Sequence, residues 1–463
     1  MTRSMTTPWL RRAALLLVLT AGAPLAGCKD ILSTTDPDII LEASSASGAL
    51  ALKNGVLLRL AQTLNGVQGP DAFFVYSGLV TDEWRSGDTF VQRNNQDQRI
   101  WEPTNTFNAD PYRRLNRVRT EGQAAIRGLR QYVPDSLHLV GRMFALGAYV
   151  ETLIGENYCN GTPLSSLEGT TIVFGQPLSN DSVLALAVAN ADSALAQTAL
   201  GLPGDSILTR KVARLAAVVR GRALLDRGQF AAAAAAVAGV PDTFRYQITH
   251  SVNANTNQIF ALNNSARRYS MVDTEGTVGL NFISANDPRL PRATGTNPST
   301  DLIFDSAYPL FVTRQGIWTS TGAVSIVTGI EARLIEAEAL LQAGNTAGWL
   351  LAINTLRTNT ALYPAAQTGF TRGPNLTAIA DTFTDNTSRM KTHFRERAFW
   401  MFSTGHRLGD MRRMVRQYAY PADSIYPRGG YYKGGAFGTA LMLPVPFEEV
   451  NNPNFTQCTN QNP

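Results

Sequence analysis

The stretch ERAFWMFSTGHRLGDMRR occupies residues 396–413 and is the most informative part of the chain. It places Arg407, Asp410 and Arg413 three residues apart, and side chains at this spacing share one face of a helix. Opposite charges on that face can pair and hold the helix against its surroundings. His406 and Asp410 are four residues apart, a spacing that more often serves a structural hydrogen bond than a ligand set. We therefore interpret this stretch as a structural helix.

Helical patterns dominate several blocks upstream of this stretch. Residues 181–198 begin with an aspartate at an N-cap position and repeat apolar residues at helical spacing. Residues 211–240 and 328–357 each indicate two helices joined at a glycine, Gly228 in the first block and Gly344 in the second. We predict helix pairs near residues 181–240, 328–357 and 388–416.

These helix pairs share a spacing of small residues. Gly221 and Ala337 each lie seven positions before the turn glycine of their pair, and the first pair also has Phe230 and Ala233 after it. Small residues at these positions let two helices approach closely, as in tetratricopeptide-like repeats. The second pair departs from this spacing after its turn, so a generic helical hairpin is the alternative interpretation.

Long stretches without periodicity separate the helical blocks and are rich in Asn, Gly, Thr and Pro. Loops of this length are uncommon in a compact domain unless they carry function. We therefore expect binding residues on these loops, with a few short strands among them. The loop-rich stretches are residues 65–109, 242–323, 358–387 and 418–463.

The composition argues against several functions. Of the 463 residues, 17% are charged and 44% are hydrophobic, which does not fit a membrane protein with many spans. The 41 basic and 36 acidic residues give a net charge of +5, and three of the basic ones lie within the first 27 residues. The rest of the sequence therefore has no stripe of basic residues that would indicate nucleic-acid binding. The motifs of zinc proteases, redox dithiols, phosphate loops and dinucleotide sites are missing, so we expect no enzyme activity, metal or cofactor.

Residues 1–27 have the pattern of a secretory signal peptide. Three arginines precede a short apolar run at residues 13–19, which is too short to span a bilayer. The sequence Leu-Ala-Gly-Cys that ends at Cys28 resembles the lipobox of bacterial lipoproteins, in which the cysteine thiol carries the lipid. We predict cleavage before Cys28 and a lipid anchor on its thiol; an incidental cysteine is the alternative.

The other two cysteines, Cys159 and Cys458, would then lie outside the cytoplasm. An oxidising compartment allows such a pair to form a disulfide. The sequence does not show that the two meet in space, so two unrelated thiols are the alternative.

The stretch at 396–413 resembles a helix of the RagB/SusD family of outer-membrane nutrient-binding lipoproteins, approximately E-R-x-x-E-x-x-x-E-G-H-R-x-x-D-L-x-R. Trp400 and Thr404 stand where this pattern has its two internal glutamates. Weaker matches follow in the family's order, among them Asp-Pro-Arg at 287–289 and Leu-Pro-Val-Pro at 443–446. The residues that match the helix pattern are Glu396, Arg397, Gly405, His406, Arg407, Asp410 and Arg413.

This resemblance implies a mainly α, SusD-like single domain over residues 28–463, built on tetratricopeptide-like helix pairs with long irregular loops and few short strands. It also implies an outward-facing lipoprotein of the outer membrane that delivers an oligosaccharide or other nutrient to a SusC-like TonB-dependent barrel transporter. A lipoprotein scaffold that binds only protein partners is the alternative. A secreted hydrolase is disfavoured because the sequence lacks a catalytic constellation.

Aromatic residues in the loop-rich stretches are the candidates for ligand binding. Sugar C–H surfaces stack on aromatic faces, and a few polar side chains bond the hydroxyl groups. A ring of this kind taken singly serves core packing more often than ligand binding. The candidates are Trp84, Trp101, Tyr269 and Trp318.

Overall fold

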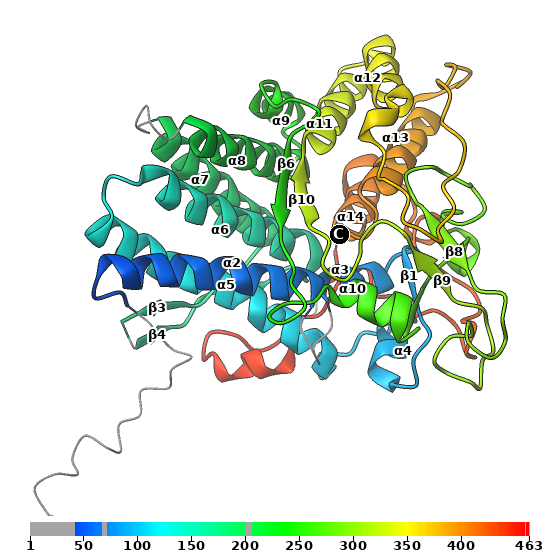
Figure 1. Ribbon diagram of the computed structural model, residues 1–463, viewed down its shortest axis with the longest axis horizontal. Coiled ribbons are helices and arrows are strands. Elements are labelled where there is room, and N and C mark those ends of the chain that lie inside the picture. Colours follow the sequence, from blue (N-terminus) through cyan, green and yellow to red (C-terminus); the bar gives the residue numbers. More distant parts are fainter. Residues whose placement is uncertain (1–41, 67–71, 170, 200–205, 459, 463) are drawn as a thin grey trace, which may run out of the picture. The chain divides into compact units, whose positions relative to one another are not determined.

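Helices carry the part of the protein that the computed structural model describes. The unit from Glu42 onward is mainly helical with a few short strand pairs, which confirms the predicted fold class (Figure 1). The predicted signal peptide and the predicted lipidation site Cys28 lie outside the described residues. The structure describes residues 42–66, 72–169, 171–199, 206–458 and 460–462.

The long helices form the scaffold, and three shorter ones lie in the loop-rich stretches. The long helices are α2 (Ala46–Asn65), α5 (Thr106–Tyr132), α6 (Leu137–Asn157), α7 (Asn180–Ala199), α8 (Ser206–Asp226), α9 (Phe230–Val237), α11 (Gly329–Gln342), α12 (Thr346–Thr358), α13 (Asn386–Trp400) and α14 (Arg407–Tyr418). The shorter helices are α3 (Phe73–Leu79), α4 (Val91–Asp97) and α10 (Gln258–Phe260).

Successive long helices pack side by side in a row (Figure 1). α6 lies between α5 and α7, α8 contacts α7 and α9, and α9 contacts α11, which pairs with α12. Among the described helices, α6 alone is long and apolar enough to cross a membrane by length and composition, and 72% of its most apolar window is buried inside the protein. Its apolar character is therefore explained by its central place in the row.

Glycines shape the predicted helix pairs. Gly228 and Gly344 end their helices in left-handed backbone, with φ of +72° and +76°. A Cβ added at Gly221 would lie 2.4 Å from a methyl group of Val237, so only glycine lets α8 and α9 approach this closely. Thr328 then begins α11, because its side chain accepts a hydrogen bond from the backbone N–H of Glu331 at 3.1 Å.

The strands form antiparallel pairs that fasten distant loops together. β1 and β7, for example, join segments that lie about 185 residues apart, as their Trp84–Met271 register shows. The pairs are β1 (Trp84–Ser86) with β7 (Tyr269–Met271), β6 (Arg245–Ile248) with β10 (Val324–Thr328), β8 (Arg292–Thr294) with β9 (Thr313–Gln315), β2 (Thr162–Pro163) with β5 (Pro177–Leu178), and β3 (Ser166–Glu168) with β4 (Thr171–Val173).

Several helices differ from the sequence prediction. The stretch at 65–109, predicted as loop, contains α3, α4 and the beginning of α5. α3 and α4 have seven residues each, too few for a periodic signal. α6 escaped prediction because it is buried on nearly all sides and has no polar face, and α5 carries Pro111 near its beginning.

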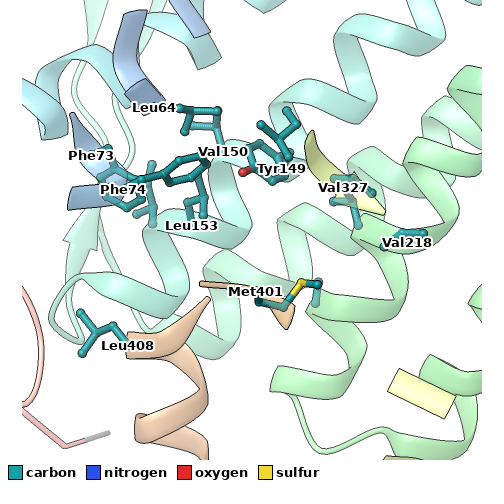
Figure 2. Close-up of a cluster of buried hydrophobic side chains, with 14 of the residues drawn as sticks. Leu64, Phe73, Phe74, Tyr149, Val150, Leu153, Val218, Val327, Met401 and Leu408 are labelled. Atoms are coloured by element: carbon teal, nitrogen blue, oxygen red, sulfur yellow. The ribbon is translucent and has the colours of Figure 1, made fainter. Parts of the chain in front are cut away.

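One hydrophobic core joins the helix row to the loop-rich segments. Figure 2 shows Phe73 and Phe74 of α3 beside Leu153 and Val150 of α6, with Met401 from the end of α13 nearby. The core thus holds the turn after α13 against the centre of the row. This turn supplies the first wall of the candidate site.

Candidate functional site

The turn between α13 and α14 has an unusual backbone that loops from elsewhere hold in place. Ser403 and Gly405 have φ of +54° and +74°, and a Cβ at Gly405 would lie 3.1 Å from the ring of Phe74. The backbone N–H of Ser403 donates to Glu83 at 2.7 Å, and the indole N–H of Trp84 donates to the Ser403 hydroxyl at 2.8 Å. Burial raises the pKa of Glu83 to about 8. The turn is therefore fixed by side chains from a segment 320 residues away.

The charged residues of the 396–413 stretch form a buried network. Arg407 binds both carboxylate oxygens of Asp82, at 2.7 and 2.9 Å. Arg397 and Arg413 both bind Asp410. Burial favours the neutral form of Asp410, but the two arginines outweigh it and lower its pKa to about 2. Buried and held in ion pairs, these side chains hold helices together and present no open group to a ligand.

Two of the predicted ligand-binding aromatics lie in the core. Trp84 and Tyr269 are both 0% exposed, on paired strands, so neither ring has a face that a ligand could reach. This corrects the prediction for these two residues, whose loop-rich surroundings in sequence did not show their burial. Trp101 is half-buried and packs against the hydrophobic core.

The fourth predicted aromatic, Trp318, lines a hollow of about 120 Å³ that we call the aromatic hollow. Its ring is almost fully packed, with 8% of the residue exposed. The other walls come from β10, the beginning of α11, the segment around Leu362 and the end of α13. The lining residues are Arg245, Arg289, Leu290, Ile317, Trp318, Ser325, Ile326, Thr328, Ile330, Glu331, Leu362, Pro364, Phe399, Trp400, Met401, Phe402, Thr404 and His406.

The two residues that stand in place of the internal glutamates of the family pattern line this hollow. Trp400 and Thr404, which replace the two internal glutamates of the pattern, line it together with His406. Among the described residues the indole N–H of Trp400 has no hydrogen-bond partner. The Thr404 hydroxyl lies 2.9 Å from Nδ1 of His406. The exchange of two acidic side chains for a ring and a hydroxyl makes the wall aromatic and less charged.

The buried charges in the wall of the aromatic hollow are balanced. Arg289 pairs with Asp287 and Glu396, at 2.6 Å each. Burial lowers the pKa of His406, so its imidazole is neutral at pH 7, and its Nε2 lies 3.1 Å from Glu331. The hollow therefore offers mainly ring faces and apolar side chains, with a few hydrogen-bonding groups at its edge.

Sequence reasoning found Trp318 but missed Trp400 as a wall residue. Trp400 lies at the end of a helix and not in a loop-rich stretch, which is where aromatic candidates were sought. The available signal was its position, because it replaces a glutamate of the family pattern. No group of three or more His, Cys, Asp or Glu side chains that could hold a metal ion occurs among the described residues.

Cys159 and Cys458 form a disulfide in the structure, with an S–S distance of 2.00 Å. The bond lies next to a backbone bridge between Asn160 and Asn460. It fastens the end of the described chain to the segment after α6. The two thiols, whose pairing the sequence left open, are thus joined.

The row of helix pairs defines the class as a mainly α protein with tetratricopeptide-like helix pairs. Its loops close the aromatic hollow. The particular fold is that of the SusD/RagB family, as comparison with solved structures shows. A SusD/RagB family protein from Bacteroides thetaiotaomicron matches with a TM-score of 0.62 and 13% sequence identity, over 87% of this chain and 94% of that chain. The resemblance seen in the sequence is thereby confirmed at the level of the fold.

Other solved structures give the same result. A SusD-like carbohydrate binding protein from Bacteroides vulgatus matches with a TM-score of 0.61 and 15% identity, over 89% of this chain and 97% of that chain. A SusD superfamily protein from Parabacteroides distasonis has a TM-score of 0.60 and 13% identity, over 90% and 100%. No family model and no curated protein matches the sequence.

Proposed function

We propose that the protein is a non-catalytic lipoprotein that binds a sugar in the aromatic hollow. The observation that carries this proposal is the meeting of Trp318 and Trp400 in one hollow of a SusD-like fold. Ring faces suit the C–H surfaces of a sugar. The carbohydrate-binding protein with the same fold supports this choice of ligand class.

The anchor and the partner belong to the same proposal. A lipid on Cys28 would hold the protein at the outer membrane, where a SusC-like TonB-dependent barrel would receive its ligand. In cells, Cys28→Ser is expected to abolish incorporation of a labelled fatty acid, while Cys159→Ser leaves it intact. A labelled Cys28→Ser protein would refute the anchor without touching the proposal for the hollow.

Ligand binding can be tested with a panel of polysaccharides, oligosaccharides and peptides. Affinity electrophoresis should find at least one retained glycan, and calorimetry should then give a single-site isotherm with its oligosaccharide. No retention, together with stable co-purification of a barrel protein from the outer membrane, would instead favour the scaffold function. Release of shorter sugars from the panel would contradict both and indicate a hydrolase.

A further inference from the structure

A second hollow, of about 340 Å³, is lined in part by α14 and shares no lining residue with the aromatic hollow. We call it the arginine hollow, because Arg412 and Arg416 of α14 both line it. The remaining walls come from the beginning of α7, the turn after α8 and the end of the described chain. Its lining is almost wholly polar, in contrast to the aromatic hollow.

Arg412 is buried and forms no ion pair with a described carboxylate, although the carboxylates of Asp226 and Glu156 lie close enough to act on its charge. Only 2% of the residue is exposed, and one terminal nitrogen, Nη1, donates to the carbonyl oxygens of Gly155, Glu156 and Tyr158 at 3.1, 2.6 and 3.2 Å. Its Nε and Nη2 have no hydrogen-bond partner, and no described carboxylate forms an ion pair with it. A buried charge in this state is costly, and an anion in the hollow would offset that cost.

Arg416 lies one helical turn further along and adds a second positive charge. It is exposed at the rim, donates to the backbone carbonyl of Asp226 at 2.6 Å and has no ion pair among the described residues. The other rim arginine, Arg227, is neutralised by Asp181 at 2.9 Å. The hollow therefore has, on one face of α14, two arginines that form no ion pair with a described residue, with the Asp226 carboxylate near both.

Unpartnered acceptors accompany the two arginines. Oδ1 of Asp226 is 3.1 Å from Arg413, but its Oδ2 has no hydrogen-bond partner. The side-chain oxygen of Gln417 also has none. Both residues line the hollow. A ligand that matches these groups must present an anion to the arginines and a hydroxyl group to the acceptors.

We propose that the arginine hollow binds a small hydroxy acid of the uronic acid type. Its carboxylate would lie between Arg416 at the rim and Arg412 at the floor, and a hydroxyl of the same molecule would donate to Asp226 or Gln417. This site is separate from the aromatic hollow and does not depend on the function proposed for that hollow. The protein would then hold a second ligand, with a different chemistry, in a hollow lined by α14.

Calorimetry with three probes tests the proposal on the whole protein. D-glucuronate carries both a carboxylate and hydroxyls, D-glucose lacks the anion, and inorganic sulfate lacks the hydroxyls. Glucuronate is expected to bind measurably more tightly than either of the others, with an affinity that falls as NaCl is raised. Glucose is expected to give no saturation.

Variants connect that binding to the arginines. Arg416→Gln removes an exposed charge at the rim, and it should weaken glucuronate binding about tenfold or more, the effect of one charge-assisted hydrogen bond. Arg412→Lys keeps the buried charge but loses the planar fork, and it should weaken binding as well. Arg220→Gln is the matched control, because Arg220 is a surface arginine of α8 outside the hollow.

Four outcomes would overturn the proposal. These are no saturation with glucuronate, sulfate binding as tight as glucuronate, unchanged binding in Arg416→Gln, or equal loss in Arg220→Gln. Circular dichroism shows whether Arg412→Lys is folded; if it is not, Arg416→Gln alone decides the result, because an exposed rim residue carries little of the stability.

Discussion

The aromatic hollow and the arginine hollow differ in how the buried arginines in their walls are paired. In the aromatic hollow, Arg289 has two carboxylate partners. In the arginine hollow, Arg412 has only backbone carbonyls as partners. An arginine that is paired with carboxylates stabilises the fold and has no need of a ligand. A buried arginine without an ion pair is costly, and a bound anion would offset that cost.

The neighbouring residues Arg412 and Arg413 give the sharpest test of this difference. Arg413 pairs with Glu338, Asp410 and Asp226, so Arg413→Met would leave buried carboxylates without a counter-charge. We expect a loss of about 3–5 kcal/mol in the free energy of unfolding. Arg412→Met breaks no ion pair and should cost about 1–3 kcal/mol through its unpaired carbonyls.

Urea unfolding of the two variants beside the wild type measures this contrast. Equal losses in the free energy of unfolding, or a larger loss for Arg412→Met, would show that pairing with carboxylates does not distinguish the two residues.

The disulfide should affect one hollow and spare the other. It closes a segment of 299 residues, and it holds the chain end that contributes Asn462 to the arginine hollow. Cys458→Ser is expected to lower the free energy of unfolding by about 2–4 kcal/mol. It should also weaken glucuronate binding and leave sugar binding in the aromatic hollow unchanged. Calorimetry of Cys458→Ser with both ligands checks this, and equal weakening of both would contradict the separation of the hollows.

The last expected effect is a dependence on pH and concerns Glu83, which holds the turn between the two helices. The folded protein keeps its carboxyl group protonated to about pH 8, while in the unfolded chain it ionises near the ordinary value of 4.5. The folded state therefore binds an extra proton between these values, and stability falls as the pH rises from about 5 to 8. Glu83→Gln keeps the shape and removes this titration.

Thermal unfolding at several pH values should show a smaller fall for Glu83→Gln than for the wild type. Glu168→Gln, at an exposed carboxylate in the turn of the β3–β4 hairpin, is the control and should follow the wild type. Parallel curves for the wild type and Glu83→Gln would contradict the assignment of the buried proton to Glu83.

The fold class could be predicted from the sequence because its signals are local or recur at a regular spacing. The turn glycines, the helix caps and the spacing of Arg407, Asp410 and Arg413 are readable without coordinates. Long helices without a polar face, such as α6, lacked the periodic pattern on which the prediction relied.

The sites were harder to predict because they depend on burial and on distant partners. Trp84 resembled Trp318 in its sequence surroundings, yet the first lies in the core and the second lines a hollow. The partners of Arg412 are backbone carbonyl groups more than 250 residues away in the sequence, and no spacing rule predicts this contact. Trp400 could have been predicted as a wall residue only because it stands where the family pattern has a glutamate.

The central claim is that the aromatic hollow binds sugar, and one measurement tests it most directly. The glycan retained in affinity electrophoresis is titrated into the wild type, Trp318→Ala and Trp101→Ala, the last a tryptophan that does not line the hollow. We predict that Trp318→Ala binds the glycan about tenfold or more weakly, while Trp101→Ala binds it as the wild type does. Unchanged affinity in Trp318→Ala would contradict it.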